Sequence, residues 1–125
     1  MGQGSCRMRV FNFWLAASLS IVCFQAAAGT ASFVAQVSKV LVDDTYYGGC
    51  MAQLTQSPTA SLPACSANWL TFDCDATFPE STKSNALNKF SQAQLALITG
   101  REVFVSFTDA RIANGYCLAN RIDLR

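Results

Sequence analysis

The clearest pattern of apolar and polar positions lies between residues 84 and 108. In its first half the apolar residues recur at helical spacing, at Ala86, Phe90, Ala93, Leu97 and Ile98. This spacing predicts an amphipathic helix with one buried stripe. Ser84 or Asn85 is suited to cap the start of the helix, and Gly100 can take the left-handed conformation that ends it.

A period of two follows directly and predicts a strand that faces a core. The apolar face of this strand consists of Val103, Val105 and Phe107. Weaker alternation predicts four further strands, at 33–42, 50–55, 69–75 and 116–123. The proline-containing segment 56–67 is expected to be a loop, and the segment 109–115 is expected to be a turn that contains Asn114-Gly115.

The predicted order is therefore strand, strand, strand, helix, strand, strand. This is the order of an OB-fold, a five-stranded Greek-key barrel whose helix plugs one end. A ferredoxin-like sheet fits less well because it needs a helix after the first strand. The first strand is apolar on parts of both faces, which suits a long strand that takes part in two layers of a barrel. We expect a mainly β fold with one helix and an OB-fold-like barrel.

The first 28 residues have the three parts of a secretory signal peptide. A cationic start with Arg7 and Arg9 precedes an apolar run and a small-residue A-x-A pattern, so cleavage is expected after Ala28. The alternative is an uncleaved anchor, but the apolar run is short for a membrane span. We expect a signal peptide at 1–28 and one secreted or periplasmic domain at 29–125, without membrane contact after cleavage.

Two of the 6 cysteines lie in the predicted leader. The others are Cys50, Cys65, Cys74 and Cys117. An even set in an exported domain predicts two disulfides. A hairpin of the second and third strands, centred near Leu62, places Cys74 opposite Cys50 and leaves Cys65 for Cys117. The spacing alone does not exclude the other two connectivities.

The composition argues against several classes of function. The sequence has no histidine, which removes the commonest general base and the commonest metal ligand. The 9 basic and 8 acidic residues nearly balance and form no basic run, so nucleic acid is not an expected partner. Cysteines held in disulfides do not act as nucleophiles. We expect no enzymatic activity, no catalytic residues, no cofactor and no metal.

Two pairs of nearby carboxylates are the remaining candidates for chemistry. Asp43 and Asp44 are adjacent, and in an extended chain they point to opposite faces. Asp73 and Asp75 would share one face of the third strand, where they could bind Ca²⁺ or act as an acid and a base. A solvated strand end is the favoured interpretation of the second pair, because its spacing matches no known metal loop.

Aromatic side chains on polar loops are the more useful signal. They offer flat apolar faces together with a hydrogen-bonding tip, which suits the binding of a glycan or a protein. The ligand-binding candidates are Asp43, Asp44, Tyr46, Tyr47 and Tyr116. The alternative is that these tyrosines only cover the ends of the barrel.

Three runs of the sequence resemble the binding (B) subunits of AB5 toxins of the subtilase-cytotoxin type, and small exported bacterial proteins of unknown role built on the same plan. These runs are YYGGCMAQL, TFDCDATF and FSQAQLALITGREVFVSF. The resemblance covers roughly residues 33–124 and implies an OB-fold, a homo-pentameric ring and binding of sialylated glycans. We expect an exported binding module for a cell-surface glycan. The alternative is a periplasmic or secreted interaction or inhibitor domain that binds a protein and has no carbohydrate site.

Overall fold

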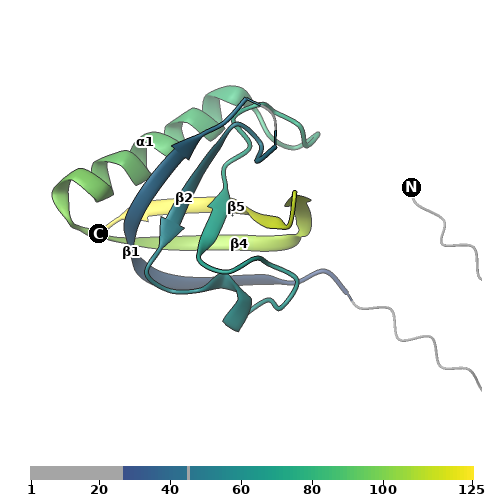
Figure 1. The fold of residues 1–125 in the computed structure, drawn as a ribbon, viewed down its shortest axis with the longest axis horizontal. Coiled ribbons are helices and arrows are strands. Elements are labelled where there is room, and N and C mark those ends of the chain that lie inside the picture. The colour runs from purple at the N-terminus through teal and green to yellow at the C-terminus, as the bar shows by residue number, and fades with distance from the viewer. Residues whose placement is uncertain (1–26, 45) are drawn as a thin grey trace, which may run out of the picture.

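The computed structural model describes residues 27–44 and 46–125 (Figure 1). The predicted signal peptide therefore lies almost wholly outside the described residues. The elements are β1 (Thr30–Val42), β2 (Cys50–Leu54), the short 3-10 helix η1 (Pro58–Ala60), β3 (Trp69–Thr71), α1 (Lys83–Thr99), β4 (Glu102–Ala113) and β5 (Tyr116–Leu124). The prediction of a mainly β fold with one α-helix, placed between the third and fourth strands, is confirmed for this part of the chain.

The strands form one sheet that closes on itself in the order β1-β2-β3-β5-β4. All neighbouring strands are antiparallel except β3 and β5, which are parallel and share only the pair Thr71↔Leu118. The long strand β1 curves through the ring (Figure 1), pairing with β4 along its first half and with β2 along its second half. The pairing with β2 has a register shift between Val37 and Lys39, so Phe33, Ala35 and Val37 face the core before it and Val40 packs against the core after it, which explains why both faces are partly apolar.

Helix α1 covers one side of the closed sheet (Figure 1). Its buried residues are Ala86, Phe90, Ala93 and Ala96. The Phe90 ring packs against Phe72, which follows β3, with 6.2 Å between the ring centroids. Gly100 ends the helix with φ 68°, as the sequence predicts. The amphipathic helix thus supplies the apolar surface that the ring of strands needs on this side.

Two details of the helix prediction are wrong. The cap is Thr82, whose hydroxyl accepts the backbone N–H of Asn85 at 3.2 Å, and not Ser84 or Asn85. Ile98 is 81% exposed, because it lies off the stripe that runs through Phe90 and Ala93 at 3.6 residues per turn. Ala96 takes its place in the buried stripe.

Two strand boundaries also differ from the prediction. Strand β3 ends at Thr71 rather than at residue 75, because Asp73 turns the chain with φ 60°. Strand β4 continues through 109–113, and only Asn114-Gly115 form the turn before β5. The predicted register, with Cys74 opposite Cys50, also differs from the structure. Met51 pairs with Thr71, and the Cys50 carbonyl accepts the N–H of Phe72, so Cys74 lies beyond the residue that pairs with Cys50.

The structure contains the two expected disulfides, Cys50–Cys74 and Cys65–Cys117. The first forms because the turn after β3 brings Cys74 back toward the start of β2. The largest core residues come from all five strands, α1 and the segment after β3: Phe33, Met51, Leu54, Leu70, Phe72, Phe90, Val103, Val105, Phe107 and Ile122. At 5.2 Å between centroids, the edge-on contact of Phe33 with Phe107 joins β1 to β4 inside the ring.

Candidate functional site

Three tyrosines lie together, and we call Tyr46, Tyr47 and Tyr116 the tyrosine cluster. The Tyr47 and Tyr116 rings meet edge to face, with 5.4 Å between their centroids, and the Tyr46 and Tyr47 centroids are 6.3 Å apart. Tyr46 is 64% exposed, whereas the other two rings are half-buried. Within the described residues no tyrosine hydroxyl of the cluster has a hydrogen-bond partner, so their hydrogen-bonding capacity is unused by this part of the chain.

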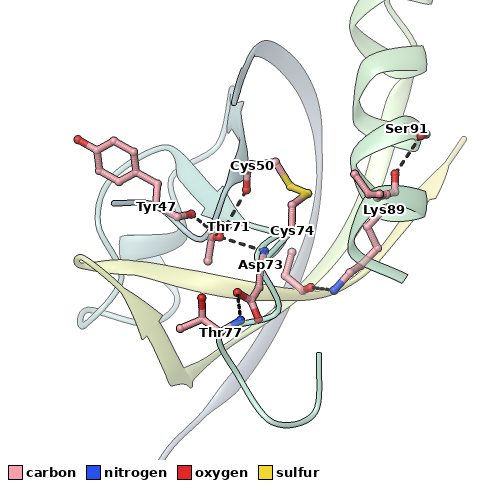
Figure 2. Close-up of a disulfide and its surroundings, with 10 residues drawn as sticks. Tyr47, Cys50, Thr71, Asp73, Cys74, Thr77, Lys89 and Ser91 are labelled. Atoms are coloured by element: carbon pink, nitrogen blue, oxygen red, sulfur yellow. Dashed lines mark hydrogen bonds between the residues drawn. A yellow bond between two sulfur atoms is a disulfide. The ribbon is translucent and has the colours of Figure 1, made fainter. Parts of the chain in front are cut away.

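The loop that carries Tyr46 and Tyr47 is held from the end of β3. The Thr71 hydroxyl donates to the Tyr47 carbonyl at 2.7 Å (Figure 2), and the Asp75 N–H donates to the Gly48 carbonyl at 3.2 Å. Gly48 and Gly49 have positive φ, and a Cβ on either would lie 2.6 Å from a side-chain oxygen of Thr71 or Asp75. Only glycine fits this close approach, and the disulfide at Cys50 fixes the residue that follows.

The turn that carries Tyr116 is held in the same way by the other disulfide. The Ser66 N–H donates to the Gly115 carbonyl at 2.9 Å, beside the Cys65–Cys117 bond. Gly115 has φ 89°, which glycine adopts without strain. Each disulfide therefore fixes one of the two loops from which the tyrosine cluster is built.

The two predicted acids of the site have different roles. One carboxylate oxygen of Asp43 accepts the Tyr46 N–H at 2.7 Å, and the Asp43 N–H donates to the Gly49 carbonyl at 3.0 Å. Asp43 therefore shapes the loop. Asp44 is exposed on the same loop, next to the aromatic rings in sequence. The structure thus brings the three tyrosines together, and Asp43 supports the loop of Tyr46 through its backbone.

The expectation that Asp73 and Asp75 share a solvated strand face is wrong. Asp73 is fully buried, and one carboxylate oxygen accepts the N–H of Thr77 at 2.9 Å (Figure 2). The other oxygen accepts the N–H of Phe78, also at 2.9 Å. Asp75 is exposed, and its carboxylate lies against Gly49. Because both oxygens of Asp73 are occupied by the backbone, this pair is not arranged to act on one ligand.

A second feature is a groove between α1 and β5, with a volume of about 390 Å³. Its polar lining includes Glu80, Asn85, Asn88, Lys89, Asn120 and Arg121. Lys89 reaches from α1 toward β5 and donates to the Ala119 carbonyl at 2.6 Å (Figure 2). Burial lowers the pKa of Lys89 below its ordinary value, and the negative charge of Asp73 opposes this effect.

Sequence reasoning missed this groove, although one signal was present. Lys89 lies three residues after Ala86 and directly before Phe90, at the edge of the buried stripe of the helix. A lysine at the edge of the buried stripe must either point into solvent or extend between α1 and β5, and Lys89 extends between them. The contribution of Asn120 and Arg121 depends on how α1 packs on β5, which no local pattern indicates.

The described residues contain no group of three or more His, Cys, Asp or Glu side chains placed to hold a metal ion. No helix in this part of the chain is long and apolar enough to cross a membrane. No protein-family model matches the sequence, and no curated protein or solved structure is significantly similar to it.

Proposed function

We propose that the chain is an exported binding module whose tyrosine cluster binds a glycan on a cell surface. The supporting observation is the contact between Tyr47 and Tyr116, two rings from loops far apart in sequence that are each fixed by a different disulfide. Two disulfides also fit an oxidising compartment outside the cytosol. A site fixed in advance loses little conformational entropy when a ligand binds.

The chemistry of the cluster suits a sugar. Tyrosine rings offer apolar faces to the C–H groups of a pyranose, while their hydroxyls and nearby carboxylates bind its hydroxyl groups. Tyr46 contributes the most accessible ring, and the exposed Asp44 and Asp75 supply carboxylate acceptors from the same loop and from the turn after β3. The half-buried rings of Tyr47 and Tyr116 contact each other.

We further propose that the closed sheet is an OB-fold-like Greek-key barrel, and that the chain works as a toxin-type B subunit. The strand order β1-β2-β3-β5-β4, with α1 between β3 and β4, supports the first part. The resemblance of the sequence to the B subunits supports the second part and implies a homo-pentamer that binds sialylated glycans. A ring of copies would raise the avidity of weak single sites.

The test is a glycan array probed with the oxidised protein, together with its solution mass from light scattering. Tyr46→Ala should weaken binding to any positive glycan by about tenfold, since one stacking ring is lost. Gln94→Ala, an exposed change on α1, is the matched control and should leave binding unchanged. A folded protein that binds no glycan on a broad array would falsify the glycan proposal, and a monomer would remove the pentamer.

A second candidate, a protein-interaction domain, is supported by exposed apolar residues on α1. Leu87, Leu95 and Ile98 are 44%, 45% and 81% exposed. Apolar side chains gathered on one solvent-facing helix mark a surface that a partner can cover. A monomeric protein that is silent on the glycan array, and whose binding to a purified partner is lost on Ile98→Lys, would favour this function over the first.

A further inference from the structure

The groove between α1 and β5 contains a lysine, Lys89, that has no carboxylate in direct contact among the described residues. Lys89 forms no ion pair among the described residues, although Glu80 and Arg121 beside it each have one, with Arg111 and Asp123 respectively. Asp73, the acid that acts on Lys89 electrostatically, directs both oxygens to backbone N–H groups instead. The Lys89 ammonium is thus half-buried without a carboxylate in direct contact, an arrangement that costs free energy.

The ammonium group of Lys89 is also held in a fixed position, and it has N–H donors that form no hydrogen bond among the described residues. Its hydrogen bond to the Ala119 carbonyl, at 2.6 Å, orients it along the groove. An ammonium carries three N–H donors, and this is the one hydrogen bond that it forms within the described residues. The two remaining donors are available to a ligand in the groove.

Neutral hydrogen-bonding groups lie beside Lys89 in the groove, in addition to the ion-paired Glu80 and Arg121. Asn85 and Asn88 lie on the same face of α1 as Lys89, and Asn120 lies on β5. The carboxamides of these three asparagines form no hydrogen bond with another described residue. Each carboxamide offers both a donor and an acceptor, so together they can bind hydroxyl or amide groups next to an anion.

We infer that this groove is a binding site for a small carboxylate ligand, with Lys89 as its cation and the three asparagines as its hydrogen-bonding groups. The volume of about 390 Å³ is that of a site for one small molecule. A singly charged carboxylate fits better than a phosphate, because Lys89 supplies one positive charge without an ion pair, whereas Arg121 in the same lining is already paired with Asp123. The site is separate from the tyrosine cluster: Figure 2 shows Tyr47 and Lys89 on opposite sides of the Cys50–Cys74 bond.

The carboxylate can be carried by a sugar acid or by an acidic amino acid, and the test separates these sources. Backbone amide resonances of the oxidised protein are followed by NMR during titration with D-glucuronate and with N-acetyl-L-glutamate α-amide. D-glucose and N-acetyl-L-glutamine amide are the uncharged counterparts. We expect at least one carboxylate to shift the resonances of Asn88, Lys89 and Asn120, and the tighter of the two to identify the source.

The variants assign the effect to Lys89. Lys89→Met keeps the apolar stem and should weaken carboxylate binding by about tenfold, whereas Lys89→Arg should retain part of it. Lys83→Met removes an exposed charge from the same helix and should change the affinity little. If Lys89→Met does not fold, the exposed change Asn88→Ala should weaken binding by about fivefold.

Several results would overturn the inference. These are no resonance shift in the groove with either carboxylate, equal binding of the uncharged counterparts, an equal loss in Lys83→Met, or tighter binding of inorganic phosphate. Tyr46→Ala should leave carboxylate binding in the groove unchanged, so the failure of the glycan proposal and the failure of this one can be told apart.

Discussion

Asp73 fixes the path of the chain where it leaves β3. Its left-handed backbone conformation ends the strand, and its buried carboxylate accepts the N–H groups of Thr77 and Phe78. Hydrogen bonds to a charged acceptor are stronger than those between neutral groups. One residue therefore sets both the end of the strand and the turn that leads to the groove.

We predict that Asp73→Asn lowers the free energy of unfolding by about 2 kcal/mol, because the amide NH₂ faces a backbone N–H that then has no acceptor. Urea unfolding followed by fluorescence measures this loss. Asp75→Asn, two residues along in an exposed position, should change the stability by less than about 0.5 kcal/mol. Equal losses in the two variants would contradict the structural role of Asp73.

Lys89 should make stability depend on pH at alkaline values. Its folded-state pKa is lowered by burial below the ordinary value of 10.5, so between the two values the unfolded chain binds more protons than the folded one. Stability attributable to Lys89 therefore rises with pH through that window. At lower pH the lysine is charged in both states, and the full cost of burying its charge is present.

The measurement is the difference in free energy of unfolding between the wild type and Lys89→Met, taken by urea titration at pH values from neutral to about 10.5. The wild type should gain stability relative to the variant as the pH rises. Lys83→Met against wild type is the control and should show a flat difference. A flat difference for Lys89→Met as well would show that Lys89 keeps its ordinary pKa.

At the scale of elements, α1 has a defined cap at each end. Thr82 accepts the Asn85 N–H, and Gly100 takes the left-handed conformation beyond Thr99. We predict that Thr82→Ala lowers the free energy of unfolding by about 1 kcal/mol through loss of the cap. Ser84→Ala, at the position that the sequence suggests as a cap, should be close to neutral; a larger loss there than in Thr82→Ala would place the cap at Ser84. Thermal unfolding of both variants checks this.

Local signals predict the centres of the elements better than their ends. The helix and the apolar face of β4 follow from side-chain periodicity, and the end of the helix follows from the glycine at position 100. The end of β3 does not, since residues 72–75 continue the alternation of apolar and polar residues, while the Asp73 side chain accepts hydrogen bonds from N–H groups further along the chain. The extension of β4 depends on its pairing with β5, through Ile112↔Cys117 and Ala113↔Tyr116.

The same distinction holds for the candidate sites. The tyrosines can be selected by residue type, but only the folded chain places Tyr116 against Tyr47. The groove is harder to predict, because part of its lining comes from β5 and the rest from α1 and the segment before it. Features made by two distant segments are absent from any single window of the sequence.

At the scale of the whole molecule, the two disulfides should contribute unequally to the free energy of unfolding. Cys65–Cys117 closes 52 residues of chain and Cys50–Cys74 closes 24, so loop entropy gives about 4 and about 3 kcal/mol respectively. We predict that, compared with the double variant Cys50→Ser, Cys74→Ser, the double variant Cys65→Ser, Cys117→Ser unfolds at a lower urea concentration. Its Tyr116 resonances should also broaden, because the turn that carries this ring loses its anchor. A smaller loss than in Cys50→Ser, Cys74→Ser would contradict this order.

The closed sheet has one weak junction, where β3 meets β5 through the single pair Thr71↔Leu118. Cys65 lies before β3 and Cys117 lies next to Leu118, so a covalent bond spans the place where the fewest backbone hydrogen bonds do. If this junction opened after reduction of the bond, the sheet would have two free edges, and exposed strand edges invite pairing with other chains. We therefore expect the Cys65–Cys117 bond to protect the protein against aggregation, in addition to the stability that it adds.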